Sequence, residues 1–366
     1  MLKDYMGILT LNENDDGLKR LTRNRTIASI PFGGRYRIID FALSNLVNAG
    51  ITNIGIFTET KSRSLLDHIG SGKPWDLDRK KSGIFLFSYN GCTDDMKLLE
   101  SNMDYLYKSK ENNVIISPSY MICNIDYEKA VEFHEKSGKD ITVIYKSIDG
   151  GNNLFNNCDI LNIDSSGKVI SVGRNIGSPS DCKISMEMFI MKKQVLIDLV
   201  LKGIKTGMYT TLKDAVYKNI NNYYINNHEF NGYAACINSI NSFYKANMDM
   251  LNLEINRDLF FKNGKVYTKV QDEAPTKYEN TSKVSNSLIA NGCIIGGTVK
   301  NSIIFRRVNI EKNANIKNCI IMQNCIIGGN ANLSNVIIDK NVEVEAHNDL
   351  IGHENMPLVL EKKTLF

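Results

Sequence analysis

The sequence predicts an α/β domain followed by a β-solenoid built of three short faces per coil. Two observations lead to this prediction. Short runs rich in Ile and Val alternate with amphipathic helical stretches through the first part of the chain. The last ~80 residues instead contain an internal repeat with a period near 17 residues. Strands that alternate with helices are typical of a mainly parallel sheet covered on both faces.

The elements of the α/β part can be named by their residues. Short runs of Ile and Val predict strands at residues 51–58, 113–117 and 140–146. Apolar residues at helical spacing predict helices at residues 39–49, 127–136, 193–201, 212–218 and 239–253.

Four tetrads mark the C-terminal repeat. They begin at Asn286, Asn301, Asn318 and Asn335, at spacings of 15, 17 and 17 residues. Isolated Val, Ile, Ala and Leu residues fall between them, and Gly and Asn fill the corners. This pattern is typical of a triangular β-solenoid, in which stacking buries the apolar face that each coil leaves open. The alternative is the edge of a β-sandwich with a fortuitous repetition.

These patterns divide the chain into three regions. We expect an α/β domain over residues 1–253 and the solenoid over residues 285–366. The segment between them, residues 254–284, is polar and contains Pro275, so we interpret it as a connector with at most one strand or hairpin.

Composition excludes several function classes. The net charge is +4, and the 44 basic residues are scattered, whereas a nucleic-acid-binding protein usually gathers them on one face. The chain starts without a secretory signal and has no apolar run of the ~18 residues that cross a membrane. The eight cysteines show no C-x-x-C pairing or metal-ligand spacing, so we expect reduced thiols, a cytoplasmic protein, and neither nucleic-acid nor membrane partners.

One long segment resembles a known family. Residues 30–50 have the sequence IPFGGRYRIIDFALSNLVNAG. This segment is similar to the signature that follows the nucleotide loop in bacterial ADP-glucose pyrophosphorylases (glucose-1-phosphate adenylyltransferases). Agreement continues in order through residues 55–58, 126–127, 232–233 and 244–251 and into the C-terminal repeat. The resemblance implies a Rossmann-like nucleotidyltransferase domain (GT-A-like) with a mainly parallel mixed sheet, followed by a left-handed parallel β-helix.

The nucleotide loop departs from the family pattern. Joining ATP to a sugar phosphate needs backbone N–H groups packed around the triphosphate, and glycine leaves room for that approach. Where the family has paired glycines, this chain has Asn12 and Glu13, and Asp15 replaces the next glycine. A lysine of the family falls at Ile27. The resemblance therefore implies negative charge where a triphosphate would sit.

The metal positions depart as well. By the resemblance, two aspartates would hold Mg²⁺, and their positions are occupied by Tyr120 and Cys236. A phenol and a thiol are poor ligands for Mg²⁺, which prefers hard oxygen donors. The sugar-phosphate lysine of the family corresponds to Arg174, which can still meet a phosphate. We therefore expect neither a resident metal nor a cofactor.

These departures resemble the noncatalytic GlgD-type subunit of the family. The resemblance implies a regulatory subunit that pairs with a catalytic GlgC-type chain in glycogen synthesis, as a homo- or heterotetramer. One alternative is an active sugar-phosphate nucleotidyltransferase with a rearranged site, in which Asp15, Asp104 or Asp126 holds Mg²⁺ and ATP binds. Another is a stand-alone sensor of a sugar phosphate.

Three arginines are candidates for an effector site or an interface. In the family, sugar-phosphate or nucleotide effectors bind basic residues near the start of the chain and one β-helix arginine. The matching positions are Arg25, Arg37 and Arg307. The guanidinium group suits phosphate because it donates two parallel hydrogen bonds. The alternative for each is a solvated charge or a structural ion pair.

Overall fold

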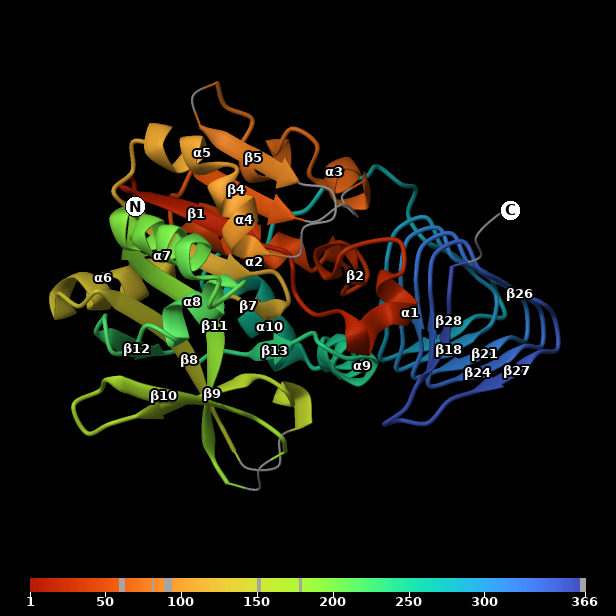
Figure 1. Ribbon diagram of the computed structural model, residues 1–366. Helices are drawn as coiled ribbons and strands as arrows, with labels where there is room; N and C mark the ends of the chain where they lie inside the picture. Colours follow the sequence, from red (N-terminus) through yellow and green to blue (C-terminus); the bar gives the residue numbers. More distant parts are fainter. Residues whose placement is uncertain (59–62, 81, 89–93, 150–152, 178–179, 363–366) are drawn as a thin grey trace. The chain divides into compact units, whose positions relative to one another are not determined.

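The chain folds into two compact units, which we describe from a computed structural model of residues 1–58, 63–80, 82–88, 94–149, 153–177 and 180–362. The α/β unit comprises residues 1–14, 39–236 and 258–267. The solenoid unit comprises residues 15–38, 237–257 and the chain from residue 268. Both units are therefore discontinuous in sequence, and the predicted boundaries after residues 253 and 284 stay a prediction. Figure 1 shows the elements of each unit.

A mixed sheet forms the centre of the α/β unit. Nine of the described strands belong to it, in the order β10-β9-β11-β6-β1-β4-β5, with β8 pairing to both β11 and β12. Their bounds are β1 Tyr5–Thr10, β4 Asn53–Thr58, β5 Gly83–Ser88, β6 Asn113–Pro118, β8 Ile141–Ile148, β9 Asp159–Ile163, β10 Val169–Arg174, β11 Cys182–Lys192 and β12 Ile225–Glu229. Strands β5, β4, β1 and β6 are parallel, whereas β11 is antiparallel to β6 and β8.

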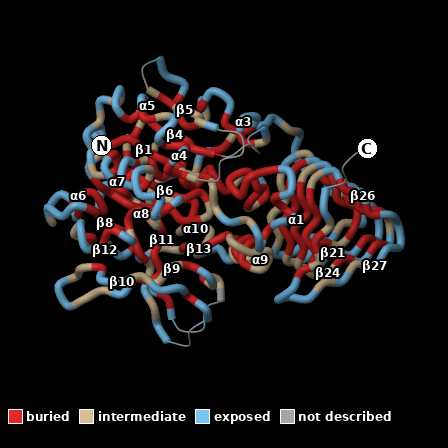
Figure 2. The backbone as a smooth tube through the Cα atoms, viewed as in Figure 1, coloured by how far each residue is buried: buried red, intermediate tan, exposed pale blue. Residues whose placement is uncertain are grey.

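Helices cover both faces of this sheet, because alternate residues of the buried strands point to opposite sides. Met6 and Ile8 of β1 belong to an apolar core shared with α4, α7 and α8. On the other face, Gly7 lies so close to α2 that an added Cβ would meet Leu46 Cδ1 at 2.7 Å. The helices of this unit are α2 Ile39–Asn48, α3 Arg63–Ile69, α4 Asp95–Glu100, α5 Met103–Lys108, α6 Tyr127–Ser137, α7 Lys193–Thr206 and α8 Leu212–Tyr217. Figure 2 shows the buried backbone of the central strands.

A short strand pair lies beside the main sheet. Strands β7 (Met121–Cys123) and β13 (Ala234–Cys236) are antiparallel, and Cys236 pairs with Met121. Helix α10 (Leu253–Phe261) and the segment to Tyr267 follow later in the chain, and Tyr267 N donates to Ser44 Oγ of α2 at 2.8 Å. The unit also contains the 3-10 helices η3 (Lys73–Trp75) and η4 (Asn153–Phe155).

The solenoid consists of three parallel sheets, one for each face of the coil. Their orders are β14-β17-β20-β23-β26, β15-β18-β21-β24-β27 and β16-β19-β22-β25-β28. The strands are β14 Lys277–Tyr278, β15 Lys283–Ser285, β16 Leu288–Ile289, β17 Ile294–Ile295, β18 Thr298–Lys300, β19 Ile303–Ile304, β20 Asn309–Ile310, β21 Asn315–Lys317, β22 Ile320–Ile321, β23 Ile326–Ile327, β24 Asn332–Ser334, β25 Val336–Ile338, β26 Glu343–Val344, β27 Asp349–Ile351 and β28 Leu358–Leu360.

The asparagines that open the tetrads form one corner of the coil. Asn286, Asn301, Asn318 and Asn335 all have positive φ, between 43° and 53°. Asparagine tolerates this left-handed conformation better than most residues do. Their side chains also form a ladder along the stack, in which Asn318 Nδ2 donates to Asn335 Oδ1 at 3.1 Å. The asparagine tetrads that repeat in the sequence therefore mark the same left-handed corner in successive coils.

Segments from earlier in the chain complete the solenoid unit. They are η1 Asp16–Leu18, α1 Lys19–Thr22, η2 Ile27–Ser29, the antiparallel pair β2 Pro31–Phe32 and β3 Tyr36–Arg37, and α9 Ile240–Asp249. Tyr244 of α9 donates its OH to Asn318 O at 2.8 Å. The outward-facing Ile303, Ile320 and Ile337 are consequently buried, so this sheet is apolar on both faces.

The structure confirms the predicted fold class and refines its elements. The predicted helix at residues 239–253 is α9, which ends at Asp249, and a separate helix, α10, begins at Leu253. The predicted connector contains most of α10 and the first solenoid strands, β14 and β15. Seven cysteines are free thiols, as predicted, and Cys92 lies outside the described residues. Within the described residues, no helix combines the length and apolar character that a membrane span requires.

Coil stacking predicts a contrast between adjacent isoleucines of β23. Ile327 points into the solenoid and is fully buried, whereas Ile326 is 40% exposed. We expect Ile327→Ala to lower the free energy of unfolding by about 2–5 kcal/mol, because it leaves a cavity among stacked coils. Ile326→Ala, the matched control, should change it by less than about 0.5 kcal/mol. Denaturant titration of both variants measures the difference, and equal losses would contradict the assigned register.

Candidate functional site

Side chains of the loop after β1 form hydrogen bonds with other parts of the α/β unit. Glu13 Oε1 accepts two hydrogen bonds, from Ser119 N and Ser119 Oγ, both at 2.7 Å. Asn12 Nδ2 donates to Asp95 Oδ1 at 2.8 Å, and Asp95 Oδ2 accepts from Leu212 N at 3.0 Å. The two residues at the glycine positions of the family thus tie β1 to β6 and α4.

Burial shifts the titration of both carboxyl groups in this loop region. It raises the pKa of Glu13 to about 7, although the two Ser119 hydrogen bonds act in the opposite direction. It also raises the pKa of Asp95 to about 6, against the bonds from Leu212 and Asn12. Glu13 Oε2 is buried without a hydrogen-bond partner. This arrangement favours a protonated acid and disfavours a bound triphosphate.

Tyr120 and Cys236, at the metal positions of the family, are brought together by the β7–β13 pair. Tyr120 directly precedes β7, and Cys236 ends β13 opposite Met121. The thiol of Cys236 is buried and in hydrogen-bond contact with that of Cys158. Burial raises the pKa of Cys236, and burial followed by the charge of Glu187 raises the pKa of Tyr120. Both groups therefore stay neutral.

An ion-pair network lies beside these two residues. Lys213 Nζ is 2.8 Å from Glu187 Oε1 and 3.0 Å from Asp159 Oδ2. Tyr120 hydrogen-bonds Glu187. Glu187 occupies a bulge of β11 with φ of 54°, a left-handed conformation that is unusual for glutamate. We call Tyr120, Cys158, Asp159, Glu187, Lys213 and Cys236 the inner cluster.

The inner cluster does not fit Mg²⁺. The metal prefers carboxylate, phosphate and water oxygens, whereas the two family positions present a neutral phenol and a neutral thiol. The carboxylates of Glu187 and Asp159 are already paired with Lys213. The charged side chains of the inner cluster neutralise one another, and we derive no metal-dependent step from them.

The other two carboxylates proposed for this pocket have partners on their own helices, and the proposed arginine lies beside the inner cluster. Asp104 is 81% exposed and pairs with Lys108 within α5. Asp126 caps α6 by accepting from Glu128 N and is 3.3 Å from Lys129. Arg174 is exposed at the end of β10, where it lies directly opposite Asp159 of the inner cluster in the β9–β10 pair. Nowhere in the described parts of the chain do three His, Cys, Asp or Glu side chains gather at metal-binding distances.

In the solenoid unit, Arg25 forms a buried ion pair. Arg25 Nη2 is 2.7 Å from Asp339 Oδ1, and Nε donates to Leu21 O at 2.7 Å. Their side chains are 7% and 6% exposed. Ile27, at the lysine position of the family, is a buried apolar residue of η2. Arg25 therefore has a structural partner, and its effector role stays a prediction.

Two of the arginines predicted to bind an effector, Arg25 and Arg37, act electrostatically on Lys340. Burial, followed by the positive charges of Arg37 and Arg25, lowers the pKa of Lys340 to about 7. Lys362 lowers it further, and Asp339 acts in the opposite direction. We call Arg25, Arg37, Lys340 and Lys362 the cationic cluster. Its repulsion is what a bound anion would relieve.

Arg307 lies at a different corner of the solenoid. Its φ is 57°, and its guanidinium Nη2 is 2.5 Å from Glu273 Oε1. The side chain is 61% exposed. Arg307 is not among the charges that shift Lys340, so the structure groups Arg25 with Arg37 and leaves the effector role of Arg307 a prediction.

Sequence reasoning missed Lys340, Lys213 and Glu187. A signal for Lys340 was present, because the repeat position after each tetrad holds Ala290-Asn291, Phe305-Arg306 and Met322-Gln323 but then Asp339-Lys340. A carboxylate in an apolar column indicates a specific partner. The sequence contains no comparable signal for Lys213, because its two carboxylate partners come from separate strands.

Comparison with known proteins finds similarity along nearly the whole chain. Residues 17–153 match the nucleotidyl transferase family model, and residues 271–356 match the GlmU-like C-terminal hexapeptide model, as expected for a left-handed β-helix. The glycogen biosynthesis protein GlgD of Bacillus subtilis (strain 168) is 36% identical over 98% of this chain and 95% of its own length. That of Geobacillus stearothermophilus is 35% identical over 86% and 83%. The glucose-1-phosphate adenylyltransferase of Clostridium novyi (strain NT) is 30% identical over 85% and 84%.

The raised pKa of Glu13 predicts a pH-dependent stability. From its ordinary value of 4.5 up to about 7, the folded state holds a proton that the unfolded state has lost. The free energy of unfolding therefore falls as pH rises through this window. Glu13→Gln keeps an acceptor for Ser119 and cannot ionise. We expect its stability relative to wild type to improve by about 1–3 kcal/mol between pH 5 and pH 8.

Thermal and urea unfolding at both pH values measure this change. Glu100→Gln, at an exposed position of α4, is the matched control and should show no pH-dependent difference from wild type. A constant offset between Glu13→Gln and wild type at all pH values would contradict the assigned titration.

Proposed function

The chain belongs to the family that comprises the GlgD glycogen biosynthesis proteins and the glucose-1-phosphate adenylyltransferases, and from this membership we propose that it is a noncatalytic subunit of glycogen biosynthesis. It would support ADP-glucose formation by a catalytic GlgC-type chain in a mixed oligomer. The subunit would raise the activity of that chain or alter its response to effectors.

The inner cluster is the observation that supports this proposal most strongly. The two positions that would hold Mg²⁺ present Tyr120 and Cys236, and the nearby carboxylates are paired with Lys213. Phosphoryl transfer depends on cations that offset the charge developing on the phosphates. The ammonium group of Lys213 is held by two carboxylates and supplies little of this compensation.

The loop after β1 supports the same proposal by charge and by shape. Glu13 sits where the family has glycine, and its carboxyl group bonds to Ser119. A side chain at this position takes the space that a closely approaching phosphate needs. When it ionises, it also adds a like charge. Both effects oppose the binding of ATP in the manner of the catalytic relatives.

We further propose that the cationic cluster binds an anionic effector, such as a sugar phosphate or a nucleotide. Lys340 is the group that we expect to meet its phosphate, together with Arg25 and Arg37, whose positive charges act on Lys340. The pKa of Lys340, lowered by burial and then by the charges of Arg37 and Arg25, supports this proposal, because a bound anion would stabilise the charged form of Lys340. A stand-alone sensor would use the same site without a partner.

Activity measurements on three samples test the proposed role. They are this protein alone, a GlgC-type chain from the same organism alone, and the two co-expressed, each with ATP, glucose-1-phosphate and Mg²⁺. We expect no ADP-glucose from this protein alone, and a higher or effector-shifted rate from the co-expressed pair.

Two outcomes would overturn it. The first is turnover by this protein alone, or by a complex in which the GlgC-type chain has lost a metal-binding aspartate through Asp→Asn substitution. Either would show that this chain itself catalyses the reaction. The second is the lack of any association or rate change with the partner, which would favour the stand-alone sensor.

Sulfate binding tests the cationic cluster, because sulfate keeps its charge between pH 6 and pH 9. We expect millimolar sulfate to raise the melting temperature at pH 6.5, where Lys340 is largely protonated. The shift should shrink at pH 9, where Lys340 is neutral, and in Lys340→Met. Lys317→Met removes an exposed charge elsewhere on the solenoid and should respond like wild type at matched ionic strength. Equal sulfate shifts in all three proteins would indicate a nonspecific salt effect.

A further inference from the structure

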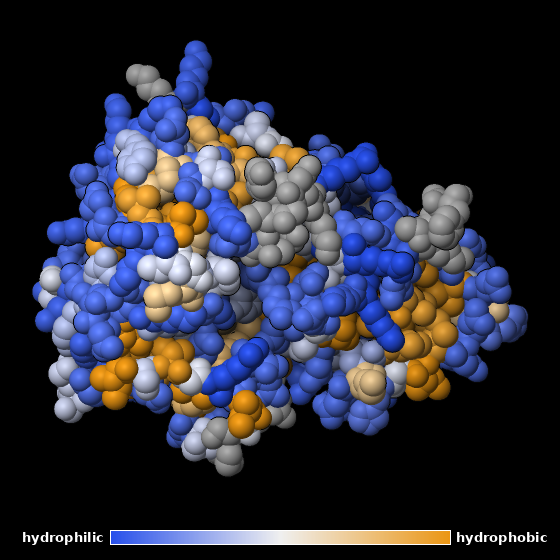
Figure 3. Space-filling view, viewed as in Figure 1, coloured by the Kyte–Doolittle hydropathy of each residue, from blue (hydrophilic) through white to orange (hydrophobic). Residues whose placement is uncertain are grey.

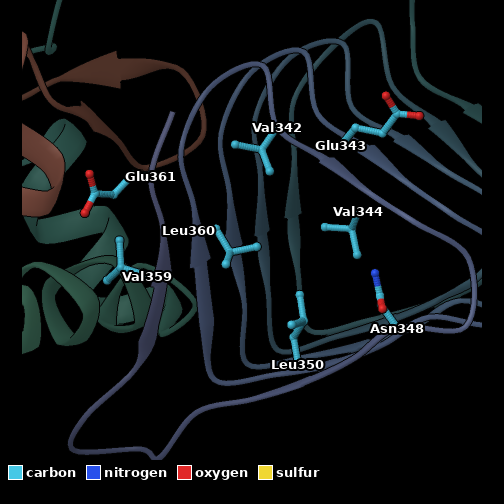
Figure 4. Close-up of a pocket in the computed structure, with 8 residues that line it drawn as sticks. All are labelled: Val342, Glu343, Val344, Asn348, Leu350, Val359, Leu360 and Glu361. Atoms are coloured by element: carbon cyan, nitrogen blue, oxygen red, sulfur yellow. The ribbon is translucent and has the colours of Figure 1, made fainter. Parts of the chain in front are cut away.

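A pocket of about 330 Å³ at the last coil of the solenoid does not suit a phosphate group. Figure 4 shows Val342, Val344 and Leu360 pointing into it, and Figure 3 shows a patch of apolar atoms at the place where Figure 1 draws β28. Glu343 and Glu361 also line the pocket, and no described basic residue does. The described cations that could hold a phosphate group therefore lie elsewhere.

In the inner cluster, Glu187 is held in an unusual backbone conformation. Its φ is 54°, in the left-handed region that glycine adopts freely and glutamate rarely adopts. It lies where the pairing of β11 with β8 shifts register between Ser185 and Met188, and its N–H donates to Ser185 Oγ at 3.0 Å. A bulge of this kind re-aims a side chain. Strained residues persist only where surrounding contacts hold them, and they cluster at ligand sites and switches.

The side chain of Glu187 occupies the donors that could hold an external anion. Its Oε1 accepts a hydrogen bond from Lys213 Nζ at 2.8 Å, and the phenol of Tyr120 hydrogen-bonds to the same carboxylate. An ammonium group and a hydroxyl are donors that a phosphate oxygen would also use. The side chain of Lys213 is 33% exposed, whereas that of Glu187 is only 10% exposed. Solvent therefore reaches the lysine, while the carboxylate that neutralises it is nearly buried.

The second carboxylate at Lys213 comes from a regular strand. Asp159, at the start of β9, has its Oδ2 3.0 Å from Lys213 Nζ and lies directly opposite Arg174 in the β9–β10 pair. Side chains at directly opposite positions are close enough to interact. Burial lowers the pKa of Lys213, but the charges of Glu187 and Asp159 outweigh burial and raise it above its usual value. Without Glu187, Asp159 would face two cations, and the site would have one positive charge in excess.

We propose that Glu187 is an internal competitor of phosphate: its carboxylate occupies the position of a phosphate group at Lys213 and keeps phosphate-bearing ligands out of the inner cluster. The strained backbone places the carboxylate there, and its negative charge repels an arriving anion. A ligand must displace Glu187 to bind, so the intact chain binds phosphate only weakly at this site. The proposal rests on the proposed function, because a subunit that responds to effectors without performing catalysis does not need to hold a substrate phosphate here.

Phosphate binding by the full chain tests this role of Glu187. Isothermal titration calorimetry with inorganic phosphate is performed at pH 7.5 and constant ionic strength, and all proteins carry Lys340→Met to suppress binding at the cationic cluster. Glu187→Gly removes the carboxylate, and glycine adopts the left-handed conformation without strain. We expect this variant to bind phosphate about 30-fold more tightly than the Lys340→Met parent, because a like charge beside the anion has been removed.

Asp159→Asn is the matched control, because it removes one negative charge from the same lysine but leaves Glu187 in place. It should gain no more than about threefold in phosphate affinity. Glu187→Gln keeps most of the side-chain volume without the charge and should gain about five- to tenfold. Adding Lys213→Met to either Glu187 variant should return phosphate binding to the level of the parent, since the ammonium group that holds the phosphate is lost.

Each failure has a definite meaning, and the melting temperature of every variant is measured alongside. If Glu187→Gly fails to fold, Glu187→Gln and its reversal by Lys213→Met decide the proposal. No gain, or equal gains in Glu187→Gly and Asp159→Asn, would overturn it, and so would a gain that survives Lys213→Met. The GlgC-type chain takes no part in these titrations. Failure of the co-expression assay therefore overturns the proposed function, whereas failure here overturns only the role of Glu187.

Discussion

The solenoid unit depends on the stacking of coils that cannot stand alone. Each strand is two or three residues long, as in Ile303–Ile304, and a pair of such strands is not stable in water. Stability comes from columns of inward side chains such as Ile295, Ile310 and Ile327, all fully or nearly fully buried. Each buried aliphatic side chain of this size contributes about 1.5–3 kcal/mol. Only a coil with neighbours on both sides obtains this contribution in full, so the last coil stays incomplete.

Corner geometry is what keeps the columns aligned. A residue in the left-handed conformation at the same corner of each three-faced coil allows each coil to repeat the one before it, and Asn318 and Asn335 supply it with little strain. This requirement explains why the solenoid was predictable from sequence. The corners need particular residues once per coil, and the spacing of the tetrads in the sequence is the length of one coil. The strands β4, β6 and β8 were predictable for a related reason, because buried parallel strands are continuous apolar runs.

The candidate sites were less accessible to sequence reasoning, because their contacts join distant residues. Arg25 and Asp339 are 314 positions apart, so no local pattern connects them. The resemblance to a family placed Tyr120 and Cys236 in one pocket, and the β7–β13 pair confirms that they lie together. It did not reveal Glu187 or Lys213, because neither residue belongs to the family motifs that carried the resemblance. Lys213 now provides the positive charge that two nearby carboxylates require.

Buried charge is treated differently in the two units, and the difference bears on what each can bind. In the α/β unit, Lys213 faces two carboxylates, which balance its charge. In the solenoid unit, burial followed by the positive charges of Arg37 and Arg25 lowers the pKa of Lys340 to about 7, while Asp339 acts in the opposite direction. An anion that relieves this repulsion raises the affinity of Lys340 for its proton, and by linkage the proton raises the affinity for the anion by the same factor. If the cluster binds an anion as proposed, binding near neutral pH is therefore accompanied by proton uptake. A surface phosphate site built from exposed lysines, which are already charged at that pH, would not take up a proton.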